Sequence, residues 1–243
     1  MASIVKNILI CIFTLGLVGC AVSPSERMAQ YQAGSKLAYI SLMGDSFDLV
    51  MTGTTIFNND AKSIDVPEWN FDQKIQDEII RSSKDSKFIF QNLSNVDKSK
   101  LDNVLKGIQK PDTLLIDAKN QGFALLVVFI PEYQSYVNGN RSGNTISVTQ
   151  NVQGYGLSKI SNLGTEQMTF LFSSGKTIIY DLTTSKEIGS VKTVGMRHSN
   201  VLHNTKFEHL TRNHIEKEKD LLFDIVTLQA KNHIRDLRVC NCW

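Results

Sequence analysis

The run at residues 123–130 restricts the fold more than any other part of the chain, because it reads Phe-Ala-Leu-Leu-Val-Val-Phe-Ile without one polar side chain. A strand of this composition has to be covered on both faces, whereas a half-exposed strand alternates apolar and polar residues. The run is short, contains valine and phenylalanine, and is closed by Pro131. It therefore predicts a buried central strand rather than a helix.

Two strand-like runs precede it, at residues 37–43 and 47–57. They are separated by Gly44, Asp45 and Ser46, and a Gly-Asp turn of this kind joins the strands of hairpins. The sequence therefore predicts an opening β-hairpin, followed by a loop at residues 58–60.

Apolar residues at helical spacing predict the helices that follow. Phe71, Ile75 and Ile79 recur every four residues and place one apolar stripe on a helix over residues 71–83. Asn70 and Gln73 have the spacing of a capping box at its start. The remaining elements predicted before the central strand are a strand at residues 87–93 and two helices, at residues 101–108 and 111–119.

The C-terminal half predicts more strands and then a helical tail. A strand over residues 145–160 should bend at residues 154–156, where glycines flank Tyr155. Short strands at residues 168–172, 177–182 and 187–194, joined by residues 173–175 and 183–185, predict an antiparallel meander. The tail at residues 207–239 is rich in Glu, Lys, Leu and Ile and predicts one long helix or two abutting helices.

Together these elements predict one α/β (α+β) domain at residues 36–239. Its sheet is expected to be mixed and largely antiparallel, with two or three helices after the opening hairpin and a long C-terminal helix. No repeat at 20 to 50 residues and no interior linker divides the chain.

The composition is that of an ordinary globular protein, with 42% hydrophobic and 21% charged residues. The net charge of +2 argues against the broad basic surface that drives nucleic-acid binding. We therefore expect no nucleic-acid partner.

No motif for nucleophilic catalysis, nucleotide binding or a cofactor occurs in the chain, so no catalytic residue and no cofactor are predicted. His198, His203, His209 and His214 cluster within seventeen positions, with His233 apart. Their spacing does not match the i, i+4 geometry of a helical metal site. Solvated or helix-capping histidines are therefore favoured, and no metal is expected.

Three weaker patterns allow other interpretations. Gly53, Thr54, Thr55 and Asn58 could bind a sugar or an anion, although a strand that kinks at Gly53 into a turn explains them more simply. Paired carboxylates could serve a hydrolase, although acidic residues are common in turns. Aromatic residues could form a contact surface, although Trp69 beside Pro67 is more simply a lid on the first helix. The carboxylates are Asp45 with Asp48 and Asp60 with Asp65, and the aromatic residues are Trp69, Tyr133, Tyr136 and Tyr155.

Two cysteines close the chain as Cys240-Asn-Cys242-Trp. They could form a redox-active or metal-binding tail at residues 240–243. The alternative is a frayed terminus with two incidental cysteines, because a metal site needs further ligands and no second Cys pair exists.

The first twenty residues resemble a bacterial lipoprotein signal. One lysine precedes an apolar core of about ten residues, too short to cross a bilayer, and Leu17-Val18-Gly19-Cys20 resembles a lipobox. The resemblance implies that a signal peptidase recognises Leu17, Val18 and Gly19 and removes residues 1–19, leaving Cys20 acylated by chains such as palmitate. Residues 20–35 would then be a tether. Ala21 after the cysteine implies the outer membrane, facing the periplasm.

From residue 36 to 131 the predicted order of elements resembles the small α/β domain of periplasmic lipoproteins of the curli-secretion and peptidoglycan-synthase-activator types. The segments at residues 41–45, 53–57 and 154–157 also resemble uncharacterised proteobacterial lipoproteins. These resemblances imply a non-enzymatic binding or assembly factor of the cell envelope, with an envelope protein or the cell wall as its partner. A lipid-anchored hydrolase of cell-wall or surface polymers is the main alternative, and assembly of a pore or secretion channel is a third.

Overall fold

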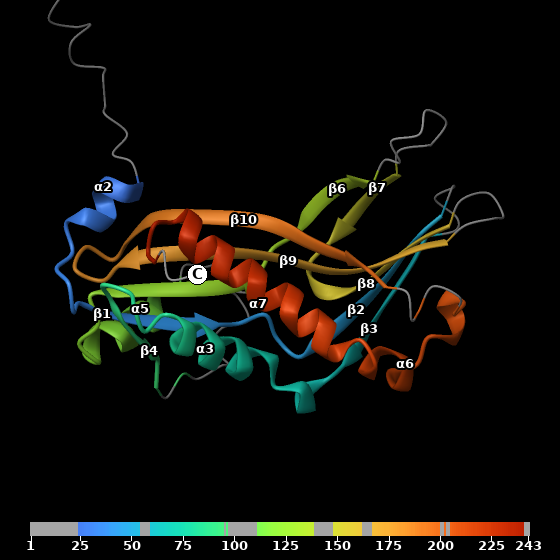
Figure 1. The fold of residues 1–243 in the computed structure, drawn as a ribbon, viewed down its shortest axis with the longest axis horizontal. Helices are drawn as coiled ribbons and strands as arrows, with labels where there is room; N and C mark the ends of the chain where they lie inside the picture. Colours follow the sequence, from blue (N-terminus) through green and yellow to red (C-terminus); the bar gives the residue numbers. More distant parts are fainter. Residues whose placement is uncertain are drawn as a thin grey trace, which may run out of the picture.

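The chain folds into a long, twisted sheet with helices packed against its faces (Figure 1). A computed structural model describes residues 24–53, 59–94, 96, 111–138, 148–161, 167–199, 202 and 205–240. The strands are β1 (Lys36–Ser41), β2 (Ser46–Thr52), β3 (Asp60–Asp65), β4 (Ile89–Asn92), β5 (Leu125–Pro131), β6 (Gln134–Asn138), β7 (Val148–Val152), β8 (Gly154–Ser161), β9 (Gln167–Asp181) and β10 (Lys186–His198). The helices are α2 (Pro24–Ala29), α3 (Phe71–Ser82), α5 (Asp112–Asn120), α6 (Arg212–Glu216) and α7 (Lys219–Asp236), with the 3-10 turns η2 (Pro67–Trp69) and η4 (Phe207–His209).

Strand β9 organises the sheet because it is long enough to pair with two strands placed end to end. Its residues 167–174 pair antiparallel with β8, and its residues 175–181 pair antiparallel with β5. β10 pairs with residues 170–181 and so occupies the other edge of β9 along both stretches. The sheet therefore consists of two halves joined by the β9–β10 ribbon.

Each half adds further strands to this ribbon. β5 is followed by β1 and β4 in parallel pairing, and β8 is followed by β2 in parallel and β3 in antiparallel pairing. The order is β3-β2-β8-β9-β5-β1-β4, with β10 on β9 and a separate β6–β7 hairpin. Among the described residues five pairings are antiparallel and three are parallel. The predicted α+β domain with a mixed, largely antiparallel sheet is confirmed.

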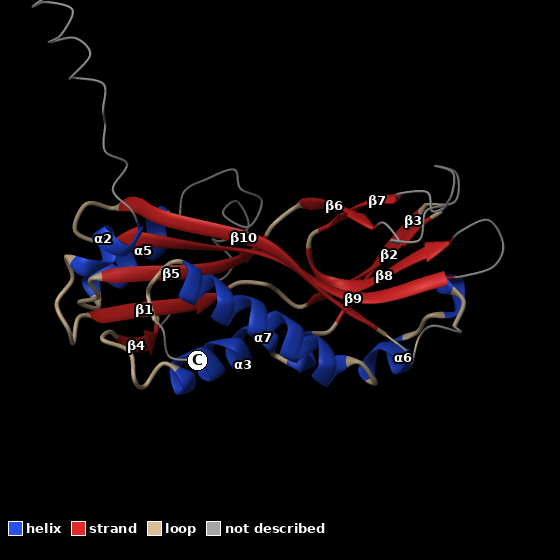
Figure 2. Cartoon of the chain, turned by 45° about the horizontal axis from the view of Figure 1, so that its top comes forward, coloured by secondary structure: helices blue, strands red, loops and turns tan. Residues whose placement is uncertain are grey.

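Helices cover the two faces of the sheet unequally (Figure 2). On one face α7 contacts β8, β9 and β10, while α3 contacts β1 and β4. On the other face α5 packs against β5. The half of the sheet that contains β1 and β5 is therefore the middle of three layers.

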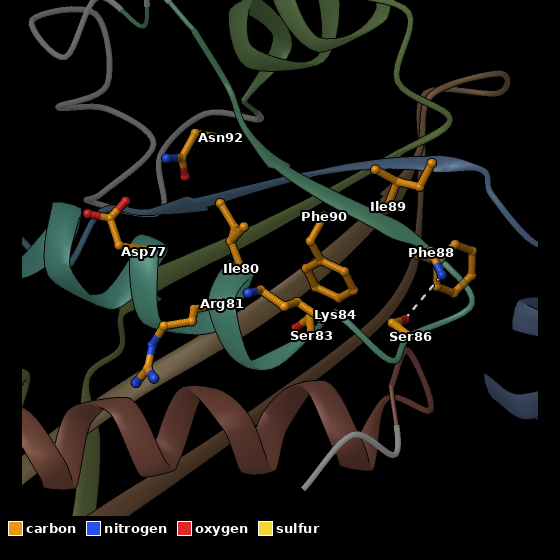
Figure 3. A pocket seen from close by; sticks show the side chains of 10 residues that line it. All are labelled: Asp77, Ile80, Arg81, Ser83, Lys84, Ser86, Phe88, Ile89, Phe90 and Asn92. Carbon is orange, nitrogen blue, oxygen red and sulfur yellow. Dashed lines mark hydrogen bonds between the residues drawn. The ribbon is translucent and has the colours of Figure 1, made fainter.

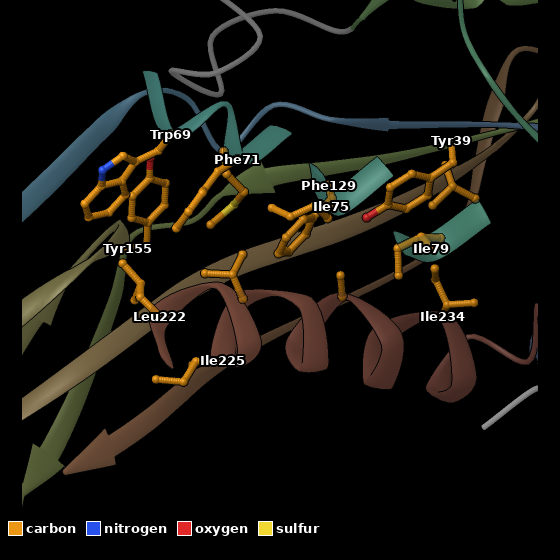
Figure 4. Close-up of a cluster of buried hydrophobic side chains, with 14 of the residues drawn as sticks. Tyr39, Trp69, Phe71, Ile75, Ile79, Phe129, Tyr155, Leu222, Ile225 and Ile234 are labelled. Atoms are coloured by element: carbon orange, nitrogen blue, oxygen red, sulfur yellow. The ribbon is translucent and has the colours of Figure 1, made fainter. Parts of the chain in front are cut away.

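β5 confirms the buried central strand predicted at residues 123–130. Its first six residues are all buried, because β1 and β9 flank the strand and helices lie on both faces. Its side chains alternate between the core under α3 and α7, drawn in Figure 4, and the core under α5: Leu125, Val127 and Phe129 join the first, and Leu126, Val128 and Ile130 the second.

The predicted opening hairpin is wrong, because β1 and β2 do not pair and run in the same direction. β1 lies between β4 and β5, whereas β2 lies between β3 and β8. Asp72 of α3 holds the connection. Its carboxylate accepts hydrogen bonds from the Ser41 hydroxyl at 2.8 Å and from the N–H groups of Met43 at 2.7 Å and Gly44 at 3.2 Å. The turn at Gly44 thus carries the chain from one half of the sheet to the other.

The predicted three-stranded meander is also wrong, because residues 168–172 and 177–182 lie along the single strand β9. Residues 173–175, predicted as a turn, are buried and paired on both edges. A Cβ on Gly175 would lie 2.5 Å from Cε2 of Phe129, so the glycine makes room for this ring. The Ser173 hydroxyl donates to Gln229 of α7. The small residues at 173–175 therefore serve close packing rather than chain reversal.

Other predicted elements are confirmed with small changes of boundary. α3, β4 and α5 match the elements predicted at residues 71–83, 87–93 and 111–119, and the tail forms two helices, α6 and α7. The predicted bend separates β7 from β8 at Gly154, where φ is +69°. The helix predicted at residues 101–108 lies outside the described residues.

The capping box predicted for α3 is wrong. Asn70 does occupy the N-cap position, but its φ of 50° is left-handed and its side chain makes no capping hydrogen bond. The reason is that the turn η2 ends on the same residue, so Asn70 adopts the conformation of a C-cap.

The chain is packed against the domain before Lys36. Met28 of α2 is buried, and its carbonyl accepts a hydrogen bond from Lys87 Nζ at 2.6 Å. Arg27 Nη1 donates to the Ile188 carbonyl of β10 at 2.8 Å. Residues 24–29, within the segment predicted as a tether, therefore contribute to the fold.

A buried polar cluster joins α7 to the β9–β10 ribbon. His233 lies between two threonines, with Nδ1 2.9 Å from Thr177 Oγ1 and Nε2 2.7 Å from Thr193 Oγ1. Burial lowers the pKa of His233 from 6.5 to about 4, because a buried imidazolium loses its hydration, and the opposing effect of Asp236 is smaller. His233 is therefore neutral at pH 7.

Acidification is expected to destabilise the domain through His233. In the unfolded chain His233 is protonated near pH 6.5, but in the folded chain only near pH 4. The stabilisation by neutral His233 is therefore complete above pH 6.5 and is lost as the pH falls towards 4. The loss amounts to about 3 kcal/mol. Urea unfolding at several pH values should show the stability difference between wild type and His233→Gln shrinking by this amount. His209→Gln, at an exposed position, should show the same pH dependence of stability as the wild type. If the stability difference between His233→Gln and the wild type does not change with pH, the prediction is wrong.

Candidate functional site

A surface groove of about 450 Å³ lies between the C-terminal half of α3 and strand β4 (Figure 3). α3 supplies one wall and β4, with the turn before it, supplies the other. Ile89 is apolar and yet 48% exposed beside the groove, whereas its neighbours Phe88 and Phe90 are buried. The lining residues are Asp77, Ile80, Arg81, Ser83, Lys84, Ser86, Phe88, Ile89, Phe90 and Asn92.

The groove carries more positive than negative charge. Arg81 donates to Glu78, which also pairs with Lys231 of α7 at 2.7 Å. Burial opposes ionisation of Glu78, but the hydrogen bonds and charges of Lys231 and Arg81 outweigh it and lower the pKa of Glu78. Lys84 is exposed and makes no ion pair with the described residues. It can therefore meet an acidic group of a ligand.

β4 borders the groove as the last strand in the sheet order. It pairs with β1 along one edge, and no strand of the described residues pairs with its other edge. An open strand edge presents backbone N–H and C=O groups to which an extended segment can add as a further strand. The edge of β4, exposed Ile89 and cationic Lys84 together suit an extended, acid-bearing peptide.

A second hollow lies between α7 and β10, around Leu228, which is 52% exposed. It divides into two parts of about 420 and 350 Å³ that share Leu228 and Arg197. Asp224, Arg235 and Asp236 line it with charges of both signs. Among the described residues β10 also pairs along one edge only, but the mixed charges of this hollow define a ligand less sharply than the groove beside β4 does.

No family model and no curated protein matches the chain. Among solved structures, the hypothetical protein CT253 from Chlamydia trachomatis is 8% identical, with a TM-score of 0.38 over 83% of this chain and 98% of that chain. Lipoprotein GNA1162 from Neisseria meningitidis is 9% identical, with a TM-score of 0.31 over 82% and 99%. The LpoB C-terminal domain from Salmonella enterica is 14% identical, with a TM-score of 0.27 over 70% and 90%. At this level of likeness the function has to be argued from the chain's own residues.

Only Gly53 of the predicted ligand patch lies within the described residues; Thr54, Thr55 and Asn58 lie outside them. Gly53 follows β2 directly and is buried, and its N–H donates to Asn59 Oδ1 at 2.9 Å. This bond joins the two ends of the connection from β2 to β3. The patch stays a prediction.

Of the two carboxylate pairs considered for a hydrolase, Asp60 and Asp65 are too far apart to act as a catalytic pair. Asp60 and Asp65 lie at opposite ends of β3, about 17 Å apart at the rise of a strand, which exceeds the separation used by glycosidases. Asp48 accepts hydrogen bonds from the hydroxyls of Ser63 and Ser46. Burial raises the pKa of Asp48, and these hydroxyls partly offset the effect.

Two of the four aromatic residues considered for a contact surface are buried instead, and Trp69 covers the start of the first helix, as the simpler interpretation predicts. Trp69 and Tyr155 are fully buried and pack against Phe71, with ring centroids 5.1 and 5.0 Å from it (Figure 4). They are buried because η2 and the start of β8 bring both rings under the first turn of α3. Tyr133 is 61% exposed, and the side chain of Tyr136 lies outside the described part.

One clustered histidine caps a helix as predicted. The Thr211 N–H donates to His214 Nδ1 at the start of α6, and the Thr211 hydroxyl lies 2.8 Å from the same nitrogen. His198 packs edge-on against Phe170, and His209 is exposed. Within the described ranges no three His, Cys, Asp or Glu side chains gather as a metal site would require.

The cysteines lie largely beyond the described chain. Leu17, Val18, Gly19, Cys20 and Cys242 fall outside it. Cys240 is buried and disulfide-bonded. In the part of the chain that the structure describes, every helix is too short or too polar to span a bilayer.

The groove between α3 and β4 was not predicted, because the elements predicted at residues 71–83 and 87–93 do not by themselves show how they meet. One local signal was present. Ile89 is apolar at a position that alternates out of phase with Phe88 and Phe90, which face the core. An apolar residue on the outer face of a strand is a weak sign of a contact surface.

Proposed function

We propose that this chain is a bacterial envelope lipoprotein that acts by binding another envelope component rather than by catalysis. Removal of residues 1–19 and acylation of Cys20 would anchor the domain at the outer membrane, facing the periplasm. The lipobox-like Leu17-Val18-Gly19-Cys20 supports the anchor, and Ala21 supports the choice of membrane. A mature chain with Cys20 acylated would then present the domain at residues 36–239 with α2 packed against it.

Replacing Cys20 by alanine is expected to abolish acylation. In cells fed a palmitate analogue the wild-type chain should be labelled and Cys20→Ala should not. In detergent phase separation the variant should partition into the aqueous phase. The two or three acyl chains of a lipoprotein hold far more strongly than a single chain, so washing with salt should not release the wild type. Cys242→Ala is the matched control and should keep its label. Label that persists in Cys20→Ala would refute the anchor.

The groove between α3 and β4 is the observation that carries the binding function. We assign to it an extended, acid-bearing segment of an envelope protein, which would pair with the edge of β4 and cover Ile89. Backbone hydrogen bonds would hold the segment and Lys84 would meet its carboxylate. The tail at residues 240–243 stays outside this proposal, since Cys240 lies within the packed domain.

Ile89→Glu is expected to weaken partner binding at least tenfold while leaving the fold intact. The side chain is half-exposed, so a charge there costs the domain little, but it places an acid against an acid-bearing segment. A photo-crosslinker at exposed Gln91 in intact cells should capture one envelope protein, identified by sequencing the crosslinked peptide. That peptide, made synthetically, then gives the affinities of wild type and variant.

Ile116→Glu is the matched control, because Ile116 is equally apolar, 58% exposed and located on α5, which packs against β5. It should bind like the wild type. Equal binding by Ile89→Glu, or crosslinks from Gln91 to no defined peptide, would remove the groove as the binding site.

A further inference from the structure

One end of the domain is formed by α2 together with three turns from distant parts of the chain. The Gly34 N–H donates to the Lys87 carbonyl at 2.7 Å, the Ala124 N–H to the Lys36 carbonyl at 2.9 Å, and the Leu182 N–H to the Ala124 carbonyl at 3.1 Å. Residues 24–36, 84–89, 119–124 and 181–188 therefore make one surface, called here the α2 end. It lies at the left of Figure 1, opposite α6.

The connection between the proposed lipid and this end is short. Three residues separate Cys20 from Pro24, the first residue of α2, so an extended chain bridges at most about 14 Å. β9 runs the length of the sheet and spans about 48 Å over its fifteen residues. Since Met28 and Arg27 fix α2 to the domain, acylated Cys20 would keep the α2 end within about a third of that length from the bilayer.

The charges of the α2 end suit an anionic surface. Six basic and four acidic residues lie there, a net charge of +2. Lys84, which lines the groove between α3 and β4, is left to the peptide, and one of the acids, Asp181, is buried. The chain from Cys20 onward has a net charge of +1, because Lys6 leaves with the signal, so everything outside the α2 end has a net charge of −1. The basic residues are Arg27, Lys36, Lys84, Lys87, Lys119 and Lys186, and the acidic ones are Glu26, Asp85, Asp181 and Glu187.

We propose that the α2 end is a membrane-docking surface that contacts anionic lipid headgroups of the bilayer holding the anchor. The proposal rests on acylation of Cys20. Each lysine or arginine near such a surface contributes about 1 kcal/mol, and the short connection removes most of the entropy cost of bringing them there. The domain therefore stands end-on, with the tips of β2 and β3 directed away from the membrane.

Quenching of a fluorescent residue by headgroup-labelled lipids tests this orientation. The full-length acylated protein is reconstituted into vesicles containing phosphatidylglycerol, with the fluorophore in place of Thr184, an exposed residue of the β9–β10 turn, or of Asp60, at the start of β3. We expect the probe at Thr184 to be quenched several-fold more strongly than the probe at Asp60. Lys119→Gln combined with Lys186→Gln should reduce this difference, and Lys206→Gln combined with Lys217→Gln, on the α6 side, should not.

Two further results separate this proposal from the anchor itself. Inserting a flexible Gly-Ser segment between Ser23 and Pro24 should remove most of the difference, and a difference that survives the insertion would contradict the role of the short connection. If the wild type floats with the vesicles but the probes at Thr184 and Asp60 are quenched equally, the docking surface is refuted and the anchor stands. If it fails to float with vesicles, the anchor itself is refuted.

Discussion

Replacing Gly156 by alanine is expected to lower the free energy of unfolding by about 3 kcal/mol or more, a large part of the roughly 5–15 kcal/mol that holds a typical domain folded. A Cβ at this position would lie 1.9 Å from the carbonyl oxygen of Asp48 and 2.7 Å from its carbonyl carbon. The obstacle is the backbone of β2, which pairs with β8 in parallel at this residue, so no side-chain rotation relieves the clash. β2 and β8 would have to separate. Urea unfolding followed by circular dichroism measures the loss.

Gly189→Ala is the matched control, since Gly189 is also a strand glycine without a positive φ. Its added Cβ would meet the end of the Leu237 side chain at 3.2 Å, which can move aside. We expect this change to alter the stability by less than about 1 kcal/mol. Equal effects of the two substitutions would show that β2 does not approach β8 at Gly156 as described.

Replacing Asp72 by alanine is expected to cost about 4 kcal/mol of unfolding free energy. The carboxylate is buried and accepts hydrogen bonds from the Ser41 hydroxyl and from the Met43 and Gly44 N–H groups. Alanine would leave the buried donors of Ser41 and Met43 without this acceptor, and each buried donor left unsatisfied costs roughly 1–3 kcal/mol. Thermal and urea unfolding of the purified variant measure the effect.

Asp72→Asn keeps the shape and one acceptor oxygen, so we expect it to lose only about half as much stability. Asp77→Ala, an exposed carboxylate on the same helix that accepts one hydrogen bond from Gln73, should change the stability by no more than about 0.5 kcal/mol. If Asp72→Ala is no more harmful than Asp77→Ala, Asp72 does not hold the connection between β1 and β2.

The two topological errors of the sequence analysis have the same origin. Gly44 and residues 173–175 both look like turns, because glycine and serine are typical of chain reversal. At Gly44 the carboxylate of Asp72, some thirty residues away, holds the chain in its crossing between the sheet halves. At residues 173–175 the Phe129 ring and Gln229 require small residues inside a strand. Asp72, Phe129 and Gln229 are all too far away in the sequence for a short segment around the turn-like residues to reveal them.

The candidate site was predictable only in its parts. Phe71, Ile75 and Ile79 revealed the buried stripe of α3, and the strand at residues 87–93 was recognised. That α3 and β4 meet in a groove follows from the parallel pairing of β4 with β1, which places the strand beside the helix. The role of His233 also depends on the fold. It stands apart from the other histidines in the sequence, but in the structure it forms hydrogen bonds to threonines of two strands.

Local patterns in the amino-acid sequence were enough to predict the central strand at β5, helices α3 and α5, the helical C-terminal tail and a lipobox-like motif ending at Cys20. Hydrophobic periodicity and turn chemistry are local, so a short window suffices for them. The pairing of the strands, the joining of two half-sheets by β9 and the packing of α2 against β10 are visible in the three-dimensional structure alone. Strand pairing depends on which faces can be covered together, and that is settled by residues tens or hundreds of positions apart.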